Sequence, residues 1–180
     1  MAIYNLDDHR YLAIDIDSVI KRLSRQFIIQ KIDGRIAITS NIRLEDKTYW
    51  ASQESTDSFN FNIPEIKSLH NDMYRLVENL FKVLYPEQAK KFRGVLENRY
   101  EVFKHFRILN NKFKHYLNDG EYDEIALIQL VEINLERTNQ RVGLMCQFKK
   151  GKDLILYNYT DFVKFFYSFL FDNKLISLEE

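Results

Sequence analysis

The chain has few of the residues that build disulfide-stapled or loop-rich proteins. Its 180 residues include one cysteine, two prolines and five glycines. A single cysteine, Cys146, excludes an internal disulfide framework and a zinc site with several cysteine ligands. The scarcity of glycine and proline favours long regular elements over loops. Because Cys146 lies in the strand-like run 142–148, we expect it to be a buried, unreactive thiol.

Long hydrophobic runs are also lacking. The aromatic stretch 162–171 is interrupted by Lys164 and Ser168 and is too short to span a bilayer. The first residues carry Asp7 and Asp8 where a secretion signal would carry cations. We therefore expect a soluble, cytoplasmic protein without membrane contact. Hydrophobic residues (46%) and charged residues (29%) occur in globular proportions, so the chain can bury a core.

The formal net charge is zero, but the charges are segregated. Residues 89–116 hold eight lysines or arginines and only two acids, whereas residues 117–136 hold six acids and no base. Two interpretations remain open. The two segments neutralise each other or are simply solvated, or the basic segment binds an anionic partner.

Periodicity in the first third of the chain is ambiguous. From Asp17 the apolar residues have helical spacing, but 27–32 fits a helix end or a strand. Asp33-Gly34 predicts a tight turn, followed by a strand at 35–39. The polar stretch 44–62 predicts a loop. Residues 1–61 are thus interpreted as an N-terminal helix and hairpin extension.

Residues 62–180 are interpreted as the main domain. Asn62 and Pro64 predict a helix start, and the apolar repeat continues to Leu84. Pro86 interrupts this helix, and a second helix is expected from Pro86 to about Leu117.

The pattern then changes to strands and a final helix. Alternation at 131–136 predicts a strand, 138–140 a turn, and 142–148 and 154–157 two further strands. Thr160 is expected to cap the last helix. The fold class predicted is α+β: a mainly helical bundle with a small antiparallel β-meander before the last helix.

Candidate functional residues gather at the end of the second predicted helix. Arg107, Asn111 and His115 recur every four residues and should stack along one edge, beside Asn110 on the core-facing side. An arginine can clamp a phosphate, and a histidine can exchange a proton near neutral pH. These groups suit metal-independent RNA cleavage, with His115 as acid/base, Arg107 as clamp and Asn111 or Asn110 as orienter.

The same residues have structural interpretations. Asn110, on the core-facing side of the predicted helix, can be a buried, hydrogen-bonded amide. His115 lies near a helix end, where the helix dipole favours a histidine. His105 is expected near the surface. The histidines lack metal-ligand spacing, so no metal or other cofactor is expected.

The segment Leu109-Asn110-Asn111-Lys112-Phe113-Lys114-His115-Tyr116 resembles the signature helix of the HEPN superfamily. Members are small helical bundles, often dimeric, and many are ribonucleases of defence and toxin–antitoxin systems. The resemblance places His115 at the motif histidine and Asn110 at its polar position, but the motif arginine falls on Leu109. It implies an RNA-binding protein or a degenerate metal-independent ribonuclease, acting as a homodimer, with RNA contacts expected at Lys104, Lys112 and Lys114.

A second hypothesis is a non-catalytic protein-interaction module, such as an immunity protein, an antitoxin or a structural partner. The strand-rich C-terminal part offers an edge for pairing with a protein partner. A small-molecule enzyme ranks third, since no glycine-rich phosphate loop or paired catalytic acids stand out.

Overall fold

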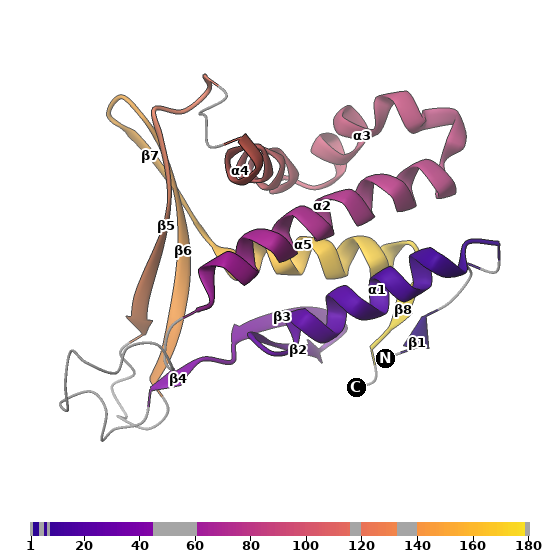
Figure 1. Cartoon of the computed structure of the whole chain (residues 1–180), viewed down its shortest axis with the longest axis horizontal. Helices are drawn as coiled ribbons and strands as arrows, with labels where there is room; N and C mark the ends of the chain where they lie inside the picture. The colour runs from indigo at the N-terminus through magenta and orange to yellow at the C-terminus, as the bar shows by residue number, and fades with distance from the viewer. Residues whose placement is uncertain are drawn as a thin grey trace.

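The computed structural model describes residues 2–3, 6, 8–44, 61–115, 120–132 and 140–178. These residues form an α+β fold in which helices predominate and a small antiparallel sheet stands at one end of the helices, as the sequence predicts (Figure 1). The helices are α1 (Arg10–Leu23), α2 (Ile63–Leu84), the 3-10 helix η2 (Pro86–Lys91), α3 (Phe92–Arg99), α4 (Phe103–His115) and α5 (Tyr159–Asp172). The strands are β1 (Ala2–Ile3), β2 (Phe27–Ile32), β3 (Arg35–Ser40), β4 (Arg43–Leu44), β5 (Glu124–Glu132), β6 (Gln140–Lys150), β7 (Asp153–Asn158) and β8 (Ile176–Ser177).

The ambiguous segment 27–32 is a strand. It pairs antiparallel with β3, and the pairing closes at Ile32 and Arg35. Asp33 and Gly34 both have positive φ angles, +50° and +73°, which suits the two-residue turn that the sequence predicts. The resulting hairpin packs on α5, and α1 packs on α2. Of the predicted loop 44–62, residues 45–60 lie outside the described part of the chain.

Helix α2 begins and ends where the sequence predicts. The side chain of Asn62 accepts a hydrogen bond of 3.1 Å from the backbone N–H of Glu65, which satisfies one free donor of the first turn. At the other end Tyr85 leaves the helical conformation in front of Pro86. The prediction of one continuous second helix is wrong, because η2, α3 and α4 take its place.

The break between α3 and α4 falls at Tyr100, which has extended backbone angles. Its ring lies 5.1 Å from that of Phe165 on α5, and its hydroxyl donates a 2.6 Å hydrogen bond to Asp172. Docking of this side chain onto α5 therefore accompanies the bend. The predicted end at Leu117 lies outside the described residues, and α4 is described as far as His115.

The central strand of the main sheet is β6. It pairs with β5 on one side and with β7 and β4 on the other, all antiparallel. This is the predicted meander before the last helix. Strand β5 begins at Glu124, seven residues before the predicted start, while 133–139 lie outside the described residues. The predicted turn at 138–140 is therefore described only at Gln140, which begins β6.

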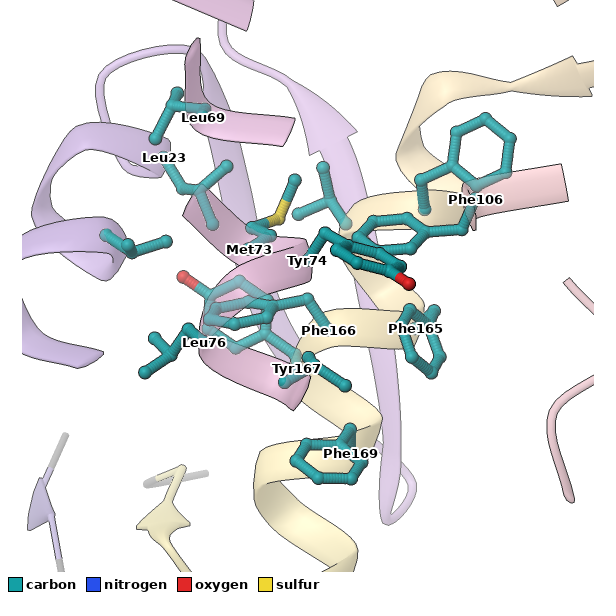
Figure 2. Close-up of a cluster of buried hydrophobic side chains, with 14 of the residues drawn as sticks. Leu23, Leu69, Met73, Tyr74, Leu76, Phe106, Phe165, Phe166, Tyr167 and Phe169 are labelled. Atoms are coloured by element: carbon teal, nitrogen blue, oxygen red, sulfur yellow. The ribbon is translucent and has the colours of Figure 1, made fainter. Parts of the chain in front are cut away.

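The N-cap of the last helix lies two residues earlier than expected. Asn158, not Thr160, is its N-cap: the Asn158 side chain accepts hydrogen bonds from the backbone N–H (3.1 Å) and the hydroxyl (2.9 Å) of Thr160. The aromatic face of α5 then packs against α2 and α4 in the core (Figure 2). Leu12 and Leu23 of α1 belong to the same core cluster, so side chains from both predicted units pack together.

Cys146 lies in this core as expected. It is fully buried, and burial raises the pKa of its thiol well above the ordinary value. Among the described helices, none has the length and apolar character needed to cross a membrane.

Candidate functional site

The guanidinium of Arg107 is held by a carboxylate. Its Nε and Nη2 atoms donate hydrogen bonds of 3.2 and 3.1 Å to the same oxygen of Glu97, on α3. The Arg107 side chain is only 18% exposed. An arginine that is half-buried and already paired offers few donors to a phosphate, so the predicted clamp is occupied within the chain.

The predicted edge of Arg107, Asn111 and His115 lies on one helix with the expected spacing of four residues. The described contacts of Arg107 go to Glu97 instead of Asn111. Asn111 is half-buried, and His115 is the last residue of α4, with a side chain outside the described part. The structure therefore aligns these residues along α4 but does not describe them as one hydrogen-bonded group.

Asn110 is buried, as its position on the core-facing side of the helix predicts. It is 4% exposed, and its Oδ1 atom makes no hydrogen bond with the described residues. A buried carbonyl oxygen without a donor costs about 1–3 kcal/mol. Asn110 thus lies behind the surface of α4, where it cannot act on a ligand bound at the exposed edge.

The three predicted RNA-binding lysines have different surroundings. Lys104 forms a 2.6 Å ion pair with Glu121, an acid of the segment that follows α4. Lys114 is exposed. Lys112 lines a cavity of about 230 Å³ together with Lys67 of α2 and the ring of Phe113. Apolar side chains complete this cavity, which we call the Phe113 hollow: Ile63, Ile125 and Leu127.

Lys67 was not predicted as a site residue. Its Nζ atom lies 5.7 Å from the centre of the Phe113 ring, within the range of a cation–π contact. Among the described residues, neither Lys67 nor Lys114 has an acidic partner within ion-pair distance. Lys67 lies 45 positions before Lys112, so only the packing of α2 on α4 brings the two together.

His105 is buried, and its prediction as a surface residue is wrong. It is 9% exposed, and both ring nitrogens contact tyrosine hydroxyls: Nε2 at 2.7 Å from Tyr122 and Nδ1 at 3.1 Å from Tyr157. Burial, assisted by the nearby charge of Lys104, lowers the pKa of His105. Ile108 and Leu109, three and four residues later, are the sequence signal that places His105 on a second buried face.

His70 is the other buried histidine. Its Nδ1 atom lies 2.8 Å from the hydroxyl of Tyr159, and its Nε2 atom lies 2.8 Å from the backbone oxygen of Phe106. Burial lowers the pKa of His70 to about 4, which the bond to Phe106 partly opposes. A neutral imidazole with a hydrogen bond at each ring nitrogen links α2, α4 and α5 and has a structural role.

No set of three or more histidine, cysteine or acidic side chains in the described residues is arranged to hold a metal ion. Comparison of the chain with protein-family models, curated proteins and solved structures gives no match. The resemblance of α4 to the HEPN signature helix therefore stays a prediction, and the candidate site rests on the geometry of α2 and α4.

Proposed function

We propose that the protein binds single-stranded RNA without cleaving it, at the surface around the Phe113 hollow. The observation that carries this proposal is the placement of Lys67 and Lys112 around the aromatic ring of Phe113. Ammonium groups neutralise backbone phosphates, and an aromatic or apolar surface accepts an unstacked base. Exposed Lys114 extends the basic surface along α4.

The pairing of Arg107 supports binding over catalysis. Stabilising the charged transition state of RNA cleavage requires a cation that is free to meet the phosphate. Arg107 instead donates to Glu97, and the position of the HEPN motif arginine is occupied by the buried Leu109. The proposal is accordingly a degenerate HEPN-like protein of a prokaryotic defence or toxin–antitoxin system that retains RNA affinity.

The test is fluorescence anisotropy with a labelled single-stranded RNA of about 20 nucleotides, in EDTA, over a series of salt concentrations. The double variant Lys67→Ala/Lys114→Ala should bind at least about tenfold more weakly, with a salt slope lower by about 1 for each phosphate that is no longer neutralised. The matched control is Lys90→Ala/Lys91→Ala, which removes two exposed lysines from η2 and should bind like the wild type.

Equal losses of affinity in the two double variants would show that binding is a general charge effect and would contradict the assignment to this surface. Failure of the wild type to bind RNA at low salt would contradict the function itself. The RNA should remain intact throughout. Cleavage in EDTA that disappears in His115→Ala would support the ribonuclease alternative.

A second candidate function is that of a protein-interaction module, such as an immunity protein or an antitoxin. It is favoured by the edge of β5, which among the described strands pairs only with β6. An unpaired edge can accept a strand from a protein partner. A stable complex with another protein, recovered from cells and without affinity for RNA, would favour this candidate.

A further inference from the structure

The sheet of β5, β6 and β7 has one buried and one exposed face. Alternate residues of β6 from Val142 to Phe148 point to the buried face, where each is at most 4% exposed. Figure 1 shows the helices on one side of this sheet only. The opposite side, which we call the outer sheet face, carries the other register of each strand: Glu124, Ala126, Ile128 and Leu130 of β5, Gly143, Met145, Gln147 and Lys149 of β6, and Leu154 and Leu156 of β7.

The outer sheet face is apolar where a solvated sheet would be polar. Ile128, Leu130, Leu154 and Leu156 are 36%, 49%, 53% and 52% exposed. An antiparallel sheet with one face in water normally alternates apolar inward and polar outward. Contiguous apolar patches of a few hundred Å² mark interaction sites in soluble proteins.

The register of β5 on β6 makes this face complementary to itself. The cross-strand pairs are Glu124 with Lys149, Ala126 with Gln147, Ile128 with Met145, and Leu130 with Gly143. A two-fold axis parallel to the strands and midway between β5 and β6 exchanges the members of each pair between two copies. Ile128 then lies over Met145 of the second copy, and Leu130 lies over the gap left by the absent side chain of Gly143.

Charge complementarity also favours a second copy. Glu124 and Lys149 are exposed, and neither forms an ion pair with the described residues. The same two-fold axis brings Glu124 of each copy over Lys149 of the other, which gives two intermolecular pairs of opposite charge. The formal net charge of zero means that two copies do not repel each other at long range.

We propose that the protein forms a homodimer by packing two outer sheet faces against each other, as in an aligned β-sandwich. Ile128, Leu130 and Met145 form the interface core, Leu154 and Leu156 of β7 flank it beside the β5 edge of the other copy, and Glu124 and Lys149 form part of its rim. This interface is separate from the Phe113 hollow, so dimer formation does not depend on RNA binding.

Sedimentation velocity of the full chain between about 1 and 100 µM tests the proposal. The wild type should be dimeric over most of this range. Ile128→Asp places a carboxylate in the interface core and should weaken the dimer at least about tenfold. Ile14→Asp, at an isoleucine of α1 that is 68% exposed, is the matched control and should leave the dimer unchanged. Circular dichroism checks that both variants are folded.

Charge-reversal variants of Glu124 and Lys149 test the position of the two-fold axis. Glu124→Lys and Lys149→Glu should each weaken self-association, because like charges then face each other in both homodimers. An equimolar mixture of the two variants should form dimers again, since each variant presents the charge that the other lacks. A monomeric wild type, a dimer that survives Ile128→Asp, or a mixture that stays as weak as its components would overturn the proposal.

Discussion

The buried imidazole of His70 predicts a specific loss of stability in acid. Its Nε2 atom faces the backbone oxygen of Phe106, which can only accept, so Nε2 carries the proton. Nδ1 is then the acceptor for the hydroxyl of Tyr159. A second proton on Nδ1 would place two donors face to face in a fully buried site, so the folded protein resists protonation of His70.

The size of the effect follows from the pKa values of the folded and unfolded chain. Burial lowers the pKa of His70 to about 4 in the folded protein, against an ordinary value of 6.5. The contribution of His70 to stability is complete above pH 6.5 and is lost as the pH falls toward 4, because the unfolded chain binds the proton first. Between pH 7.5 and pH 5 the free energy of unfolding should fall by about 2 kcal/mol from this residue.

Urea unfolding followed by far-ultraviolet circular dichroism at a series of pH values measures this loss. His70→Gln keeps a donor and an acceptor but does not titrate, so the variant should lose about 2 kcal/mol less than the wild type over the same range. His105, whose pKa is also lowered, is present in both proteins and cancels in the difference. Parallel pH profiles for the two proteins would refute the assignment of the titration to His70.

Two further predictions concern α5. Tyr159→Phe removes the donor to His70 and should cost about 1–3 kcal/mol. Tyr167→Phe should be neutral or stabilising, because the buried hydroxyl of Tyr167 (Figure 2) has no hydrogen-bond partner among the described residues. Thermal unfolding of both variants measures the two costs, and equal costs would contradict the reasoning. Asn158→Ala should cost about 1 kcal/mol through loss of the helix cap, which is more than the cost of Thr160→Ala. Urea unfolding of the two variants measures both costs, and a larger cost for Thr160→Ala would contradict the assignment of the cap.

Local signals predicted the elements that they specify directly. Asp33-Gly34 provides the positive φ angles of a hairpin turn, and Asn62 provides a cap in the turn before Pro64. The break at Tyr100 has no such signal, because neither glycine nor proline occurs there and the helical spacing continues across it. It coincides with a contact between residues 100 and 165, which only the folded chain brings together.

The candidate site was predictable in part for the same reason. Spacing along α4 placed Arg107 and Asn111 on one edge and placed Asn110 toward the core, where it is buried. The partners of these side chains come from other elements. Glu97 reaches Arg107 across the break between α3 and α4, and Lys67 reaches Phe113 from α2.

Ion pairs within the chain account for part of the charge segregation along the sequence. Lys104 pairs with Glu121 of the acidic segment, and Arg107 pairs with Glu97, so much of the basic character of α4 is neutralised within the chain. Lys67 and Lys114 lack such acidic partners among the described residues. A phosphate that approached Arg107 would have to displace the Glu97 carboxylate, whereas one that approached Lys67 or Lys114 would meet no described carboxylate within ion-pair distance. An anionic ligand should therefore favour the Phe113 hollow over the edge that contains Arg107.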